Sequence, residues 1–349
     1  MALDVAFLKA LTSVAGTSGF ESRPAAVWRD RAQEAGASLS SDAYGNVFAA
    51  FRPGGRPRVM LAGHIDEIGL LVNYIDDKGF LYVRPVGGWD PMQLVGQRVR
   101  VLGYGGDIVG VIGKKAIHLM SAEDRRKVPS MEDLWIDIGA TSAEEAGSWV
   151  RAGDSAVIEQ TFVELLNGRV ASRAIDDRIG AYVALEAARR AAGNAEVIAV
   201  ATVQEEIGGV GARAAAFALE PDVAIAIDVT HATDTPGLEK KLHGDVPLAG
   251  GPSLSAGSYV HRSVMERLRS TAEREGIAVS MGVSPRSTGT DADNIAPSRA
   301  GTPSAVVSIP NRYMHSPNEV VDLADVERTI ELLAAFIAGL DADTRFLHD

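Results

Sequence analysis

Five short segments of the sequence carry the histidine and carboxylate side chains that could do chemistry. Four of them stand at, or just past, the end of an apolar run that is typical of a buried strand. In open α/β sheets, ligands bind outside the carboxyl ends of the strands, so this placement suits a functional site. Imidazoles and carboxylates are ligands for zinc, cobalt or manganese. The segments are Gly63–Asp66, Ala174–Gly180, Gln204–Gly208, Ala226–Asp228 and Met314–Pro317.

The first segment places His64 two residues before Asp66. In an extended chain, residues i and i+2 point to the same side. The carboxylate can therefore hydrogen-bond the imidazole and fix its tautomer, as the partners of metal-binding histidines usually do. The alternative is a local ion pair at the end of a strand.

Glu205 and Glu206 directly follow the apolar run Val197–Val203. Two adjacent carboxylates beside a core repel each other and are costly to bury without cations. A metal ion would remove that cost for one of them and leave the other as a base. The alternative is that the strand emerges into solvent at this point.

Asp176 and Asp177 follow a strand-like run and open a predicted helix. An aspartate at a helix start is commonly an N-cap. A carboxylate can also bridge two cations through its two oxygens. Both interpretations remain open from the residues alone.

Asp228 ends the buried run Val223–Ile227, and a charge there needs a partner. His315 stands in a proline-flanked loop after the predicted strand Ser304–Ile309, where a histidine is often merely exposed. Taken together, the five segments supply two histidines and several carboxylates at the strand ends of one sheet. Two ions sharing a carboxylate would sit roughly 3.5–4 Å apart, as in hydrolytic two-metal sites.

Composition excludes several other kinds of site. The 349 residues include 34 Lys plus Arg and 46 Asp plus Glu, for a net charge of −12. This balance argues against a nucleic-acid binder and gives no reason to seek an anionic membrane. The sequence has no cysteine, which excludes disulfides, thiolate metal sites and cysteine nucleophiles. No apolar run approaches the ~18–20 residues of a membrane span, and no signal-like segment opens the chain. We therefore expect a cytoplasmic protein without a membrane partner.

The elements around these segments predict an α/β fold. From Ile175 onward, helical patterns alternate with buried strands, which implies a doubly wound mixed sheet sandwiched by helices. Between Gly69 and Glu159 the pattern changes to short β-like runs broken by Gly, Asp and Pro, typical of a small barrel or sandwich. We expect one α/β domain, residues 1–68 and 160–349, interrupted by a β-barrel domain, residues 69–159. Two sequential domains that meet near residue 160 are the alternative.

The motifs also resemble those of a known family, the tetrahedral aminopeptidases, which are dinuclear metallopeptidases that include glutamyl aminopeptidases. The resemblance spans nearly the whole chain and implies a di-zinc aminopeptidase-like fold. It is carried by Gly63–Gly69, Asp176–Gly180, Val203–Glu206, Asp228, Gly289–Ala292 and Arg312–Pro317.

The resemblance implies an enzyme that removes N-terminal residues from peptides with a free N-terminus. It implies two divalent ions per subunit, with Zn²⁺ favoured over Co²⁺ or Mn²⁺, and a cis peptide between Asp176 and Asp177. It also implies that the barrel mediates dimerisation and that dimers assemble into a tetrahedral dodecamer. The implied roles are His64 and Asp228 on one metal, Glu206 and His315 on the other, Asp176 bridging them, Glu205 as general base and Asp66 orienting His64.

Other functions remain as alternatives. A different di-metal hydrolase, such as a deacylase, a carboxypeptidase or an endoglucanase, could use the same ligands. A carboxypeptidase needs an arginine for the terminal carboxylate, and Arg178 and Arg312 are candidates. A non-catalytic, metal-stabilised peptide-binding assembly would give no reason for Glu205. His231, three residues beyond Asp228, could compete as a ligand, but a role next to the ligands or facing the substrate is favoured for it. Asp291 and Asp293 are expected to line the pocket or to be structural.

Overall fold

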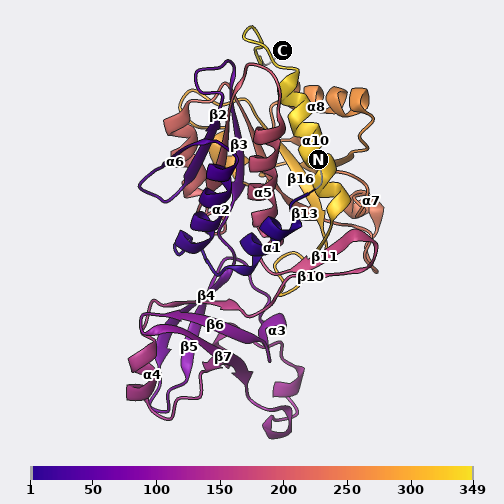
Figure 1. The fold of residues 1–349 in the computed structure, drawn as a ribbon. Coiled ribbons are helices and arrows are strands. Elements are labelled where there is room, and N and C mark those ends of the chain that lie inside the picture. The colour runs from indigo at the N-terminus through magenta and orange to yellow at the C-terminus, as the bar shows by residue number, and fades with distance from the viewer. Residues whose placement is uncertain (1–2, 348–349) are drawn as a thin grey trace.

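The fold was described in a computed structural model for residues 3–347. A large α/β body makes up most of the molecule, and a β-barrel lies at the end opposite the C-terminal segment (Figure 1). The helices are α1 (Val5–Ser13), α2 (Ser22–Glu34), α3 (Pro91–Leu94), α4 (Ala143–Trp149), α5 (Ile175–Arg190), α6 (Val210–Leu219), α7 (Lys240–His243), α8 (Arg262–Glu275), α9 (Ala292–Ile295) and α10 (Leu323–Ala338).

The α/β body is built on a mixed eight-stranded sheet. Its four central strands, β12, β3, β13 and β16, run parallel to one another, whereas β2 and β14 flank them in antiparallel pairing. The strand order is β1 (Ser38–Ser41), β2 (Val47–Phe51), β12 (Glu196–Thr202), β3 (Arg58–His64), β13 (Val223–His231), β16 (Ser304–Asn311), β14 (Ser253–Gly257) and β15 (Ser280–Ser284).

Both faces of this sheet are buried, and the alternation of side chains along β3 shows how. Val59 and Leu61 pack into a cluster with α5, α8 and α10, while Met60 and Ala62 pack on the other face against α6. Strands buried on both faces read as continuous apolar runs, which is why the central strands were predictable. The predicted α/β fold with a helix-covered mixed sheet is confirmed.

The barrel closes in the order β4-β5-β8-β7-β6-β9 and has a separate apolar core. The predicted barrel or sandwich is therefore a closed barrel, although the division of the chain into domains at the expected bounds stays a prediction. The barrel strands are β4 (Gly69–Ile75), β5 (Leu81–Val86), β6 (Arg98–Gly103), β7 (Gly106–Lys114), β8 (Leu134–Asp137) and β9 (Ser155–Ile158).

A small sheet lies beside the body and consists of β10 (Val163–Glu164), β11 (Arg169–Ser172) and β17 (Glu319–Asp322). It places the start of α5 next to the loop that follows β16, because β11 leads into α5 and β17 returns from that loop. Within residues 3–347, none of the helices is both long and apolar enough to cross a membrane.

Candidate metal centre

The structure brings the seven predicted site residues together at the carboxyl edge of the central strands. His64 ends β3 and is level with Thr202, the last residue of the neighbouring β12. Glu205 and Glu206 follow β12 in the next turn of chain, and Asp228 lies in β13. The remaining ligand candidates come from outside the parallel strands. Asp176 stands at the start of α5, and His315 follows β16.

The Asp176 carboxylate lies between the two imidazoles. Its Oδ1 is 3.2 Å from Nε2 of His64, and its Oδ2 is 3.4 Å from Nε2 of His315. Glu206 approaches from the His315 side, with Oε1 3.5 Å from the same Nε2. One carboxylate thus offers a separate oxygen to each histidine, as expected of a group that bridges two cations.

The other nitrogen of each imidazole faces an oxygen acceptor. His64 Nδ1 is 3.2 Å from the backbone carbonyl of Asp66, and His315 Nδ1 is 2.9 Å from the carbonyl of Gly88. Because a carbonyl oxygen can only accept, Nδ1 must carry the proton in both rings. In the neutral ring, the Nε2 lone pair then points toward Asp176, which is the tautomer that metal-binding histidines use.

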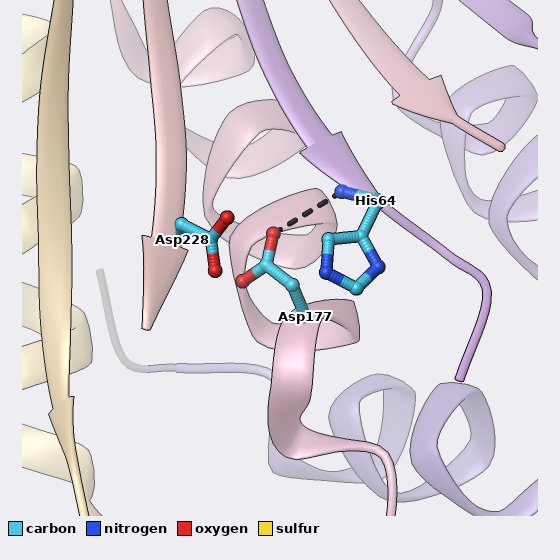
Figure 2. A group of neighbouring side chains, drawn as sticks. All are labelled: His64, Asp177 and Asp228. Atoms are coloured by element: carbon cyan, nitrogen blue, oxygen red, sulfur yellow. Dashed lines mark hydrogen bonds between the residues drawn. The ribbon is translucent and has the colours of Figure 1, made fainter. Parts of the chain in front are cut away.

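Asp177 contributes a further buried carboxylate that the sequence analysis did not place in the site. Donor atoms of His64, Asp177 and Asp228 lie within 4.8 Å of one another, as do those of His64, Asp176 and Glu206. In Figure 2 the Asp177 carboxylate lies between Asp228 and the backbone nitrogen of His64. It accepts that N–H at 3.1 Å and the N–H of Gly180 at 3.1 Å, so its oxygens already fix β3 to α5. The Asp176–Asp177 peptide is cis, as the resemblance implied.

Asp66 is fully buried and connects several parts of the site. Its Oδ1 lies 3.4 Å from His64 Nδ1 and also accepts the backbone N–H of Glu205 at 3.1 Å. Its Oδ2 accepts the N–H of Glu206 at 3.2 Å and the hydroxyl of Ser18 at 2.6 Å. Asp66 therefore fixes the turn that carries both glutamates as well as facing His64. Sequence reasoning missed Ser18, which stands far away in the chain and in no motif.

Glu319 is a second buried connector that the sequence analysis missed. Its Oε2 accepts the backbone N–H of Asp176 at 2.9 Å, and its Oε1 accepts that of His315 at 3.0 Å. This glutamate in β17 thus joins the two segments that carry ligand candidates from outside the central strands. The available signal in the sequence was weak: a charged residue four positions after His315, beside two valines.

The electrostatics of the site indicate too much negative charge for the protein alone. Burial raises the pKa of Glu205 to about 8 against the opposing effect of His64, and burial also raises the pKa values of Glu206 and Asp228 well above their usual range. Although burial disfavours its charged form, hydrogen bonds to Asp176 and Asp66 raise the pKa of His64 well above 6.5.

Asp176 shows the opposite shift. Burial opposes its ionisation, but hydrogen bonds from His315 and His64 lower its pKa overall. The buried Oε1 of Glu206 accepts no hydrogen bond from the described residues. In the metal-free site, bound protons therefore neutralise part of the negative charge of the carboxylates, a role that divalent cations would fill better. The donor set of imidazole and carboxylate fits such cations.

A cleft of about 540 Å³ opens beside these groups and is lined by residues of several loops, including His231, Thr290, Asp293 and Met314. His231 is exposed at the end of β13, where it faces the cleft. Asp293 lines the cleft and holds the loop before it through the backbone N–H groups of Thr288 and Gly289. Asp291 is buried and accepts the hydroxyl of Thr202 at 2.5 Å.

Comparisons with known proteins agree with this geometry. The model of the M42 glutamyl aminopeptidase family matches residues 45–332. A lysyl aminopeptidase from Pyrococcus furiosus is 38% identical over 345 residues, which cover 97% of this chain and 98% of that protein. A TET aminopeptidase from Thaumarchaeota archaeon SCGC AB-539-E09 superposes with a TM-score of 0.92 at 35% identity, covering 97% of this chain and 96% of that one. The TET1 peptidase of Pyrococcus horikoshii, which can assemble into a tetrahedron or a large octahedral shell, gives a TM-score of 0.85 at 35% identity, covering 96% and 99%.

These similarities extend over both the α/β body and the barrel, so they concern the whole described chain rather than a shared core. The family that the sequence motifs indicated is the one that the family model identifies. The chain belongs to the M42 glutamyl aminopeptidase family.

Proposed function

We propose that the protein is a dinuclear metal-dependent aminopeptidase that releases N-terminal residues from peptides. The observation that carries the proposal is the position of Asp176, whose two oxygens lie 3.2 and 3.4 Å from Nε2 of His64 and of His315. A carboxylate held between two correctly oriented imidazoles is suited to bridge two divalent ions. Zn²⁺ fits the donor set best, and Co²⁺ or Mn²⁺ fit as substitutes.

We assign the ligands to two sides of the centre. The strand side consists of His64 and Asp228 and would hold one ion. The loop side consists of Glu206 and His315 and would hold the other, with Asp176 shared between them. When bound, the two ions would activate a water molecule as the nucleophile and polarise the scissile carbonyl.

Glu205 is the general base in this proposal. Its Oε2 lies 3.8 Å from Nε2 of His64, and its backbone is fixed by Asp66, so the carboxylate stands beside the ligands. Burial raises its pKa to about 8 in the metal-free site, and two bound cations nearby would lower that pKa again, so that the ionised carboxylate could accept a proton near neutral pH. The carboxylate would take the proton of the nucleophile and pass it to the nitrogen of the leaving amine.

The charge around the cleft favours a substrate with a free amino terminus. The lining includes carboxylates of Glu206, Asp228 and Asp293, and no lysine or arginine is among the described residues that line it. A cationic ammonium group fits these surroundings, whereas the terminal carboxylate of a carboxypeptidase substrate has no cationic side chain to bind.

The two arginines considered for a carboxypeptidase are occupied elsewhere. Arg178 is fully buried and donates to Glu67 at 2.8 Å and to the carbonyl of Ile65 at 3.0 Å. Arg312 pairs with Asp234 at 2.6 Å. These contacts favour action at the amino end of the peptide.

We also propose that residues 69–159 form a dimerisation domain and that dimers assemble into a tetrahedral dodecamer. The assembly of the similar Pyrococcus horikoshii TET1 peptidase into closed shells supports this proposal. Large apolar side chains that a subunit contact would cover are exposed on the barrel strands and on helix α4, including Tyr74, Val109 and Trp149.

Cleavage of matched peptides tests the proposed function. Free and N-acetylated peptides that differ in the first residue are incubated with the protein, with and without chelator and added Zn²⁺ or Co²⁺. We expect release of the first residue only, blocked by acetylation and by the chelator. Release from the other end or removal of the acyl group would instead support a carboxypeptidase or a deacylase, and cleavage of a β-glucan offered in a parallel assay would support an endoglucanase. Bound metal without any cleavage would support a peptide-binding assembly.

A further inference from the structure

A turn of the barrel reaches into the loop side of the centre. The turn comprises Gly87 and Gly88 and connects β5 to the short helix α3. The carbonyl of Gly88 accepts the Nδ1–H of His315 at 2.9 Å. This hydrogen bond crosses from the barrel to the loop after β16, and it orients the imidazole whose Nε2 faces Asp176 and Glu206.

The turn is also too close to the same side chains to carry a side chain of its own. A Cβ at Gly88 would lie 3.0 Å from Nδ1 and 3.3 Å from Cε1 of His315. A Cβ at Gly87 would clash with Cγ2 of Ile68 and would lie 3.0 Å from Oε2 of Glu206, and this glycine has a φ of +73°, which disfavours other residues. Gly88 therefore packs against His315, and Gly87 packs against Ile68 and Glu206.

The strand side is oriented by different parts of the chain. The Nδ1 of His64 faces Asp66 two residues along the same segment, and the His64 backbone N–H is held by Asp177 of α5. Its orientation therefore comes from the α/β body. A disturbance at Gly88 would therefore reach His315 first.

We propose that the Gly87–Gly88 turn of the barrel is a positioning element of the loop side and sets the affinity of one of the two ions. This inference rests on the proposed dinuclear function. The carbonyl of Gly88 fixes the tautomer and direction of His315, and the absence of side chains lets the turn close over both ligands. Changing a residue that orients a metal ligand typically weakens metal binding roughly 10- to 100-fold.

Zinc titration of a Gly88→Ala variant tests this inference. Gly88 has no left-handed φ, so the added methyl group acts through its contact with His315 rather than through backbone strain. Metal-free protein is titrated with Zn²⁺ against a chromophoric chelator, and the ions bound per subunit are counted. We expect one ion to bind with wild-type affinity and the other to bind about 10-fold or more weakly.

Two further measurements separate positioning from a general loss of structure. Gly147→Ala is the control, because this glycine lies in barrel helix α4 with nothing within 4 Å of its added Cβ, and we expect it to bind both ions normally. In Gly88→Ala, kcat should recover toward the wild-type value at high free Zn²⁺, because only occupancy is impaired.

Unchanged affinity for both ions in Gly88→Ala would overturn the inference, as would equal weakening of both ions or loss of the folded state by circular dichroism. These results are distinguishable from a failure of the proposed function. Wild-type protein that binds fewer than two ions, or that binds two and cleaves no peptide, would contradict the proposed function whatever the variant does.

Discussion

The strand side and the loop side of the proposed metal centre use similar ligands, but the chain builds them differently. His64 and Asp228 lie on adjacent parallel strands in the middle of the sheet, and the His64 side chain is 2% exposed. Glu206 and His315 follow strands β12 and β16 in loops, and the His315 side chain is 36% exposed. The strand side is thus formed by the sheet itself, whereas the loop side is held by contacts from the small sheet and the barrel.

This difference predicts which side of the metal centre should lose its ion more readily. Central strands open only with global unfolding, whereas loops open locally at lower free energy. The loop side depends on Glu319 from the small sheet and on Gly88 from the barrel. We therefore expect the ion of the loop side to dissociate first and to exchange faster.

The largest expected effect comes from a residue that we place on neither side. Glu205→Gln should lower kcat by about 10²- to 10⁴-fold, because the variant cannot accept the proton of the nucleophile. It should keep both ions, since Glu205 is not assigned as a ligand. Steady-state kinetics and metal counting on the same sample measure both. Glu206→Gln is the comparison and should lose the loop-side ion. Loss of an ion in Glu205→Gln would show that this residue belongs to the strand side as a ligand.

Removing one histidine from each side compares the two directly. His64→Ala should destabilise the metal-free protein by about 3 kcal/mol or more, since it removes a buried partner that Asp66 and Asp176 share. His315→Ala should cost less than about 1 kcal/mol because the ring is partly exposed. Urea unfolding measures both values, and metal counting should find one ion retained in His315→Ala. Equal costs would contradict the proposed difference between the sides.

The metal-free protein should lose stability as the pH rises. Burial raises the pKa of Glu205 to about 8, so the folded state holds a proton that the unfolded state releases. A raised pKa stabilises the fold at low pH, and this contribution is lost as the pH rises through the folded value. His64, whose pKa is also raised, acts in the same direction.

Between about pH 6 and about pH 8, the contribution of Glu205 to this loss should be about 2 kcal/mol, at about 1.4 kcal/mol for each pKa unit, and the raised pKa values of Glu206 and Asp228 add to it. The lowered pKa of Asp176 acts with the opposite sign, but only at acid pH below this range. Thermal unfolding with and without Zn²⁺ measures the effect, and bound ions should flatten the dependence. A flat profile in the metal-free protein would argue against the excess of buried negative charge.

The smallest expected effect concerns the connection between the two loops. In Glu319→Gln, one carboxylate oxygen becomes an amide nitrogen that faces a backbone N–H of Asp176 or His315. We expect a loss of about 1 kcal/mol in unfolding free energy and weaker binding of the loop-side ion. Zinc titration and urea unfolding are the measurements. Glu327→Gln, which removes a pairing with Arg190 on the body, is the control and should leave metal binding unchanged.

Much of the fold was predictable because the central elements have strong patterns. The apolar runs Val197–Val203, Val223–Ile227 and Ser304–Ile309 predicted β12, β13 and β16 to within a few residues. The strands β14 and β15 at one end of the sheet were not predicted, since Ser253–Gly257 and Ser280–Ser284 are rich in small and polar residues. The strand at Asp228 was predicted to end there, yet it continues to His231 because β16 pairs with it along that length.

The candidate site likewise contains residues that the sequence predicts and residues that it does not. His64, Glu205, Glu206 and Asp228 were predictable because charge at the end of a buried run is unusual. Glu319 was missed because its partners, Asp176 and His315, come together only through the small sheet. The carbonyl of Gly88 could not have been found, since a backbone oxygen has no residue type to mark it.

The hydrogen bonds of Asp66 have a consequence for how such a centre can diversify. One carboxylate faces His64 and holds the backbones of Glu205 and Glu206, so a substitution there would disturb base and ligands together. Variation in metal preference or exchange rate is then confined to positions that act on one side only. The loop after β16 and the Gly87–Gly88 turn of the barrel are such positions. Substitutions there could change the metal preference or exchange rate in descendants of this sequence, while Asp66 and the groups that it holds stay unchanged.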